Sequence, residues 1–236
     1  MANQLDVGSI LSETASIVQD NKQIVLLYAA VIGGVTAVGI LFGLTEASGA
    51  AIAWNWGGLV STENGLLGGL LDLFLAIGSI VGLYWLSKSF LASRNRIVHD
   101  ENRFWHYLGM TILASIGMVI GFALLIVPGI ILLVRWSAAN GFLLSGREGV
   151  IDSLKASWEA TRGNALMIFL AGLVMFLVLG LLTGFIASIL AVLSPVAGQM
   201  IGALMEAAVN AVLPAFGIAV YCLLEDNGEN LEEVFS

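Results

Sequence analysis

The chain has 236 residues, of which 58% are apolar and only 11% are charged, and its mean hydropathy is +0.96. Apolar runs of more than 18 residues recur along it, so this composition excludes an ordinary water-soluble domain and indicates a polytopic helical membrane protein. The net charge of −8 does not contradict this, since the positions of lysine and arginine matter more in a membrane protein than the sum of all charges. The single cysteine, Cys222, excludes an internal disulfide.

The first predicted element is an amphipathic helix over residues 5–21. Apolar side chains such as Ile10 and Ile17 recur at helical spacing on one side, and acidic side chains lie elsewhere. An acidic polar face is not suited to attracting anionic headgroups. We therefore expect an interfacial helix in the membrane plane, held by burial against the other helices, with lipid sensing as the alternative.

Six apolar segments follow, each of them suited to a transmembrane helix. The predicted spans are residues 23–44, 65–86, 106–127, 129–145, 164–193 and 198–224. In the loop between the first two, Trp54 and Trp56 are placed as an interfacial aromatic pair.

Prolines mark two short turns and one interruption. Pro128 with Gly129 predicts the turn between the third and fourth spans, and Ser194 with Pro195 predicts the turn between the fifth and sixth. Pro214 lies inside the sixth span and predicts a kink there.

A second interfacial helix is predicted over residues 149–162. Leu154 and Trp158 belong to its apolar face, whereas Lys155 belongs to its polar face, and Gly163 is placed to end the helix. The whole chain, residues 1–236, is thus expected to form one integral membrane domain. Its predicted fold is an all-α, six-transmembrane helical bundle with two amphipathic interfacial helices.

The basic residues predict the orientation. Eight of the nine fall before the first span, between the second and third, or between the fourth and fifth: Lys22, Lys88, Arg94, Arg96, Arg103, Arg147, Lys155 and Arg162. The opposite loops contain none, and the ninth, Arg135, lies inside a span. By the positive-inside rule both termini are cytoplasmic, and the expected location is the inner (plasma) membrane of a bacterial cell.

Pairs of glycines four residues apart predict close helix packing in five of the six spans. The pairs are Gly39 and Gly43, Gly65 and Gly69, Gly78 and Gly82, Gly117 and Gly121, Gly180 and Gly184, and Gly198 and Gly202. Packing within one compact bundle is the expected use of these pairs. A homodimer seam and a glycine-rich transport pathway are the alternatives.

The central stretch carries a family resemblance. PGIILLVRWSAANGFLL, then EGVIDSLKASWEATRGN, then a long apolar span resembles the membrane domain that precedes the catalytic domain of some glycerophosphoryl diester phosphodiesterases, and related stand-alone bacterial membrane proteins. LDVGSILSETASIV before the first span is similar to the opening of that family. In the family the phosphodiesterase chemistry belongs to a separate soluble barrel, which this chain is too short to contain, so the resemblance implies a membrane domain without that activity.

The sequence lacks the signatures of common catalytic sites. It contains no G-x-S-x-G elbow, no phosphate-binding loop ending in Lys-Ser or Lys-Thr, no H-E-x-x-H and no pair of cysteines. His99, Asp100, Glu101 and His106 could in principle hold a metal or move a proton, but their place in a basic surface loop favours a solvated role. We expect no enzyme activity, no catalytic residue, no metal, no cofactor and no nucleic-acid partner; membrane lipids are the expected partners, and protein partners are left open.

Three ionisable residues lie within predicted spans, where charges are costly and often functional. Asp72, Arg135 and Glu206 each follow the outer end of a span by six to eight residues, which predicts similar depths of about 9 to 12 Å. Arg135 could bind both carboxylates, and Asn210 lies one turn beyond Glu206. This intramembrane polar cluster is either a structural lock or a proton- or substrate-binding site. The first alternative suits a non-catalytic packing or lipid-associated scaffold, and the second a small transporter or lipid-handling protein.

Overall fold

The computed structural model describes residues 5–45, 65–98, 102–146 and 148–235, with side chains described as far as Asp226. All regular structure in these ranges is helical, as predicted. The aromatic pair Trp54 and Trp56, and the loop residues His99 to Glu101, lie outside the described residues.

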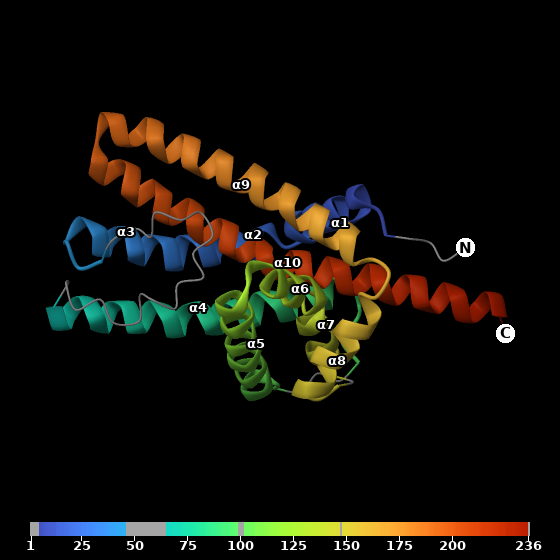
Figure 1. Ribbon diagram of the computed structural model, residues 1–236. Coiled ribbons are helices and arrows are strands. Elements are labelled where there is room, and N and C mark those ends of the chain that lie inside the picture. The colour runs from blue at the N-terminus through green and yellow to red at the C-terminus, as the bar shows by residue number, and fades with distance from the viewer. Residues whose placement is uncertain (1–4, 46–64, 99–101, 147, 236) are drawn as a thin grey trace. The chain divides into compact units, whose positions relative to one another are not determined.

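The helices are shown in chain order in Figure 1. They are α1 (Val7–Asp20), α2 (Lys22–Tyr28), the π-helical η1 (Ala29–Gly33), α3 (Gly34–Leu41), α4 (Gly65–Ser93), α5 (Phe104–Leu124), α6 (Ile126–Arg135), α7 (Ala139–Leu144), α8 (Val150–Ala160), α9 (Ala165–Leu193) and α10 (Pro195–Phe235). Within the described ranges six stretches are long and apolar enough to cross a membrane: Lys22–Leu41, Gly65–Ser93, Phe104–Leu124, Ile126–Leu144, Ala165–Leu193 and Pro195–Asp226. The prediction of six apolar segments is therefore confirmed.

The chain forms two compact units, each built from separate segments. Unit 1 comprises Met1–Asn21, Ser87–Leu173 and Pro214–Ser236, and unit 2 comprises Lys22–Leu86 and Val174–Leu213. Helices α4, α9 and α10 each contribute one part to each unit. Pro214 is the first residue of α10 in unit 1, and α10 continues through it as helix.

Helix α1 opens unit 1 with a well-formed cap. The Asp6 side chain accepts a hydrogen bond from the Gly8 backbone N–H at 3.2 Å, and the Ser9 hydroxyl accepts one from the Asp6 N–H, which completes a capping box. Ile10 and Ile17 are fully buried by the rest of the protein. The helix predicted over residues 5–21 is therefore present, and its position in the membrane plane stays a prediction.

Helices α5 and α6 form an antiparallel hairpin whose turn was misplaced by the sequence reasoning. The only residue between them is Leu125, in extended conformation, and α6 begins at Ile126. Pro128 lies in the first turn of α6, where backbone N–H groups have no helical partner to lose. Gly129 lies instead at the helix contact: a Cβ added at Gly121 would be 3.1 Å from the Gly129 Cα.

The predicted fourth span, residues 129–145, is broken into α6 and α7 by the turn after Arg135. The Ser157 hydroxyl of α8 donates a 2.7 Å hydrogen bond to the Arg135 carbonyl, so α8 satisfies an acceptor that the break exposes. On α10, Gly217 allows the Ser137 carbonyl to approach, since an added Cβ would lie 2.6 Å from that oxygen. Periodicity alone does not reveal this break, because both halves are apolar.

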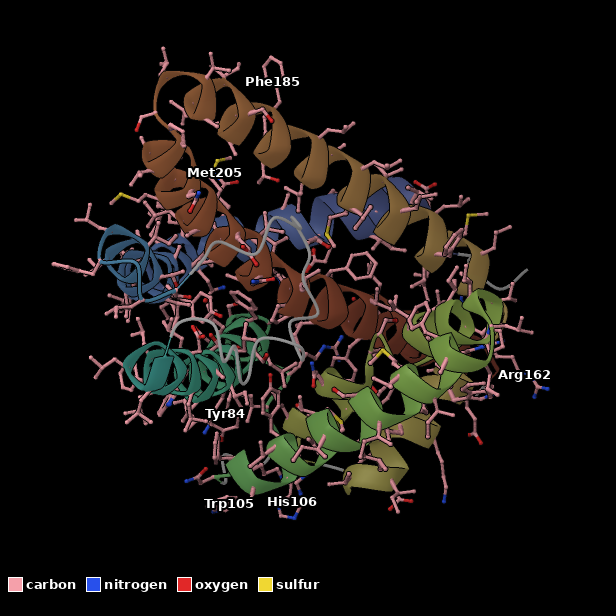
Figure 2. All side chains as sticks on the ribbon, turned by 60° about the vertical axis from the view of Figure 1, so that its left-hand side comes forward. Tyr84, Trp105, His106, Arg162, Phe185 and Met205 are labelled. Carbon is pink, nitrogen blue, oxygen red and sulfur yellow. The ribbon has the colours of Figure 1, made fainter. Side chains whose placement is uncertain are left out.

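Residues 214–222 of α10 are buried in unit 1. Ile218, Ala219 and Val220 are fully buried, and the Tyr221 ring packs edge-on against Phe142 with ring centroids 4.9 Å apart. In Figures 1 and 2, α5 runs across the direction of this part of α10 rather than alongside it.

Helix α8 packs chiefly against α7, and its inward side differs from the predicted apolar face. Ser153, Leu154 and Ser157 are buried, whereas Trp158 is 41% exposed. Small hydroxyl side chains permit the close contact and hydrogen-bond to carbonyls, so they are tolerated inside. Gly163 has a φ of +91° just after the helix, which confirms its predicted role in ending it.

Unit 2 contains α2, η1 and α3, which together form the first candidate span, next to its part of α4. Tyr28 packs against Gly82, where an added Cβ would lie 2.7 Å from the ring. A Cβ added at Gly78 would lie 3.5 Å from the Ile32 side chain. Gly33 is five residues after Tyr28, and a Cβ added there would lie 2.7 Å from the Leu204 Cα. The π-helical turn separates these two contacts.

Helices α9 and α10 form a tight hairpin in unit 2. The turn at Ser194 and Pro195 is confirmed, with Pro195 at the first helical position and the Ser194 hydroxyl accepting from the Ala197 N–H at 3.3 Å. A Cβ added at Gly198 would lie 2.8 Å from Ala191. The pairs at 39 and 43, 78 and 82, 117 and 121, and 198 and 202 thus include close contacts, whereas Cβ atoms added at Gly69 and Gly184 would meet no described atom within 4 Å.

Large apolar side chains are exposed along the candidate spans. Leu66 of α4, Leu125 at the hairpin turn and Val192 of α9 are 82%, 68% and 86% exposed. A soluble monomer rarely tolerates contiguous apolar surface of this kind, whereas lipid tails solvate it without cost. The structure therefore agrees with a multi-pass membrane protein.

Candidate functional site: polar groups of the apolar helices

Three of the four predicted cluster residues belong to unit 2. Asp72 of α4 accepts a 2.9 Å hydrogen bond from the Thr45 hydroxyl, which comes from the segment after α3. Thr45 is itself buried against Gly39, where an added Cβ would lie 2.6 Å from the threonine methyl group. Glu206 and Asn210 lie one turn apart on α10, as predicted. The Thr45 contact was missed, because Thr45 lies beyond the predicted end of the first span.

Arg135 belongs to unit 1 and ends α6. Its Nη1 lies 3.4 Å from both the Trp158 carbonyl oxygen and the Thr161 hydroxyl oxygen, and its Cζ lies 5.4 Å from the centre of the Trp158 ring. These groups are neutral and all come from α8 or the residue that follows it. The sequence reasoning did not anticipate them, because it treated Trp158 as part of a separate helix in the membrane plane.

The predicted meeting of Arg135 with Asp72 and Glu206 joins residues of different units, so it stays a prediction. The observed helix starts do change the depth estimates behind it. Asp72 is seven residues from the start of α4, Arg135 is ten from the turn at Leu125, and Glu206 is eleven from the start of α10. At about 1.5 Å per residue these are about 10, 15 and 17 Å along the helices, so the helix starts do not set the three residues at equal distances, and their similar depth in a membrane stays a prediction.

A second group of charges, which the sequence reasoning missed, joins α1 to the loop after α4. All three nitrogens of the Arg94 guanidinium bind α1: Nε to Glu13 at 2.7 Å, Nη1 to Asp20 at 2.8 Å, and Nη2 to Ser16 at 2.8 Å. We call these four residues the Arg94 hub. Burial alone would lower the pKa of Arg94, but the hydrogen bonds and charges of Asp20 and Glu13 outweigh it and raise the pKa.

Polar contacts next to the hub continue the same attachment. The Asn21 amide donates to the Ser93 hydroxyl at 3.0 Å and to the Ile17 carbonyl at 2.9 Å, and its oxygen accepts from the Ser89 hydroxyl at 3.0 Å. The acidic side chains on the polar face of α1 therefore have a use within the protein. The spacing of Glu13, Ser16 and Asp20 was the available signal, because it places the two carboxylates and the hydroxyl on one side of a helix.

The other arginines of this loop also bind protein groups. Arg96 forms an ion pair with Asp226 near the end of the described part of α10. Arg103 Nη1 donates to the Leu143 carbonyl at 3.0 Å, near the C-terminus of α7, and to the Glu148 carbonyl at 2.6 Å, between α7 and α8. The positive-inside rule used these basic residues to predict orientation, which stays a prediction. Arg94, Arg96 and Arg103 also fasten three elements of unit 1.

No group of three or more histidine, cysteine, aspartate or glutamate side chains suited to a metal is present among the described residues. His106 lies at the N-terminal end of α5 beside Trp105, and Figure 2 shows both side chains at the outer edge of the helix. The other members of the His99–Glu101 cluster fall in the part of the chain that is not described.

Comparison of this chain with protein-family models, curated proteins and solved structures found no match. Two kinds of polar site in the structure therefore bear on the function. One consists of ion pairs between elements of unit 1, which resist separation of those elements. The other consists of ionisable groups within apolar helices, which can bind a polar ligand or one another.

Proposed function

We propose that this chain is a non-catalytic, multi-pass protein of the inner membrane, with both termini in the cytoplasm, that acts as a packing or lipid-associated scaffold. The Arg94 hub is the observation that carries the proposal. Arg94, Arg96 and Arg103 of the loop after α4 bind groups of α1, α10 and α7 respectively. Charges used in this way hold a bundle together and favour a fixed arrangement over a moving one.

The resemblance to the membrane domain of glycerophosphoryl diester phosphodiesterases supports the same role. In that family the membrane domain and the catalytic barrel are separate, so the membrane part has a role of its own. The exposed apolar side chains of α4 and α9 supply the lipid contact. In the simplest topology each of the six candidate spans crosses the bilayer once.

The alternative is a small transporter or lipid-handling protein that uses Asp72, Arg135, Glu206 and Asn210. It is favoured by the general observation that ionisable residues inside spans mark ligand and proton pathways. The two roles differ in hydration. A transport site needs water to reach Asn210, whereas a scaffold keeps that residue dry.

Cysteine accessibility separates these roles. In a Cys222→Ala background, cysteine would be placed at Asn210, at the fully buried Ala211 as the unreactive control, and at exposed Ser93 as the reactive control. A membrane-impermeant thiol reagent is then applied to both sides of the vesicle membrane. The scaffold predicts that position 210 reacts as slowly as position 211. A rate approaching that of position 93 would identify a hydrated pathway and refute the scaffold.

A further inference from the structure

The contacts of Arg135 with the described residues of unit 1 include no anion for its positive charge. Its contacts are a carbonyl, a hydroxyl and an aromatic ring, and both hydrogen-bond distances are 3.4 Å. Good N–H···O bonds are about 2.9 Å long, and a guanidinium has five N–H donors arranged to bind two oxygens of one anion. These two long hydrogen bonds therefore leave guanidinium donors available to an oxyanion.

The surface leading to Arg135 is apolar and exposed. Val127 and Ile131 precede it by eight and four residues on one side of α6 and are 64% and 46% exposed. Trp158 borders the cation on α8 and is also exposed. An anion that combines an oxyanion head with an apolar tail fits this surface, and tryptophan beside a cation is typical of the headgroup level of a membrane.

The height of the α5–α6 hairpin decides where Arg135 lies in a bilayer. The hairpin turn is apolar and exposed from Leu124 to Val127, whereas turns that reach water usually carry polar residues. From Leu125 to Arg135 is ten residues, or about 15 Å, which matches one leaflet of an apolar core about 30 Å thick.

The exposure of α5 agrees with this height. Apart from Trp105, its large exposed apolar side chains fall between Ile112 and Leu124, a rise of about 18 Å. Helix α7, which continues from α6, buries Ala139, Leu143 and Leu144 and offers them no lipid contact. The length of the exposed apolar part of the hairpin is thus close to the thickness of one leaflet.

We propose that Arg135 and Trp158 bind the phosphate of a lipid in the cytoplasmic leaflet, whose acyl chains lie along Ile131 and Val127, with the tip of the α5–α6 hairpin embedded in that leaflet. The inference rests on the membrane assignment proposed above and replaces two of the six crossings by a hairpin. An even number of crossings remains, so both termini stay on one side. The basic residues before and after the hairpin also stay on one side, as the positive-inside rule requires.

The first test measures the depth of the hairpin tip. Cysteine at Leu125 in the Cys222→Ala background would be treated with an impermeant thiol reagent from each side, with Ser61→Cys as the control for the outer side and Ser93→Cys for the cytoplasmic side. An embedded tip reacts from neither side, and a spin label there contacts oxygen dissolved in lipid. Reaction from the outer side at the rate of position 61 would overturn the proposal.

The second test counts bound lipid. The full chain in nanodiscs containing phosphatidylglycerol would be released and its retained lipids counted by native mass spectrometry. Charge-assisted hydrogen bonds predict that Arg135→Gln weakens retention about tenfold, and that Arg135→Lys weakens it less. The matched control is Arg162→Gln, because Figure 2 shows the Arg162 side chain extending away from the helices. Equal retention by Arg135→Gln and Arg162→Gln would overturn the proposal.

Two further variants keep the test decisive. If Arg135→Gln fails to fold, Trp158→Leu keeps an apolar side chain, removes the ring and is expected to reduce retention. If adding Asp72→Asn and Glu206→Gln to Arg135→Gln restores folding and retention, the anion is a carboxylate of the protein and the lipid site is refuted. Competition by inorganic phosphate would indicate a soluble ligand and would also refute the lipid site. None of these results changes labelling at position 210, so the scaffold proposal is judged separately.

Discussion

Among the described glycines, Gly141 has the least room for an added Cβ, so its replacement by alanine is a sharp test of the packing. An added Cβ would lie 2.2 Å from Cγ and 2.4 Å from Cβ of Tyr221. Ordinary carbon contacts are about 3.5 to 4.0 Å, so α7 and α10 would have to separate by more than about 1 Å. Tyr221 is 1% exposed, and these two atoms are fixed close to its backbone, so its ring cannot swing away to relieve the clash.

The expected cost follows from two opposing effects. Overpacking a filled core costs up to about 3 kcal/mol, whereas glycine to alanine in a helix gains up to about 1 kcal/mol. The net loss of about 2 kcal/mol corresponds to about a 30-fold change in the unfolding equilibrium. Gly117→Ala should cost less, because its Cβ would meet only the far end of the Trp136 ring at 2.6 Å. Gly109→Ala meets nothing within 4 Å and should be neutral or stabilising.

The measurement is unfolding by dodecyl sulfate in mixed micelles, followed by tryptophan fluorescence, for the three alanine variants and the parent. The expected order of stability is Gly109→Ala, then Gly117→Ala, then Gly141→Ala. If Gly141→Ala were as stable as Gly109→Ala, α7 and α10 would not touch as described.

Three further predictions concern the loop after α4, the topology and α8. Arg94→Gln should destabilise the protein by about 1 to 3 kcal/mol in the same unfolding assay, and Arg94→Lys by less, because lysine keeps the charge but cannot bind Glu13, Ser16 and Asp20 together. Since the pKa of Arg94 is raised, its contribution to stability is present throughout the neutral range and is lost only as the pH rises through that pKa. If the stability difference between Arg94→Gln and the parent disappeared near pH 7, the hub would be contradicted. Cysteines at Ser61 and Ser93 in the Cys222→Ala background should label from opposite sides of intact vesicles. If both label from the same side, the prediction that α4 crosses the membrane is refuted. Leu154→Asp should reduce folded yield more than Trp158→Asp, and both more than Lys155→Ala, because Leu154 is 7% and Trp158 41% exposed. Equal yields of the three variants would show that α8 is not packed on α7.

The sequence reasoning located the helices better than their ends and contacts. Apolar runs reveal six long segments because hydropathy is a local property, and Gly163 and Pro195 mark boundaries for local stereochemical reasons. Pro128 was misleading because proline is tolerated both in a turn and in the first turn of a helix, and only the backbone shows that Leu125 makes the turn.

Contacts between segments far apart in the sequence were harder to predict. Gly141 and Gly217 make some of the closest approaches in unit 1, yet neither belongs to a glycine pair four residues apart. Arg94 and its partners are separated by more than 70 residues, and without the fold its charge could equally serve orientation or lipid binding. The partners of Arg135 on α8 depend on the break after α6, which has no signature in hydropathy.

The π-helical turn at Ala29–Gly33 gives the first span a rotational phase as well as a length. A π-turn accommodates one residue more than the α-helical turn it replaces, and each residue of an α-helix turns the chain by about 100°. Tyr28 meets Gly82 before the turn, and Gly33 meets Leu204 at its end. Deleting a single residue between them would leave the span apolar and nearly as long, but would rotate one contact out of register with the other. A substitution here changes one side chain, whereas a one-residue deletion changes the direction in which half of the span faces.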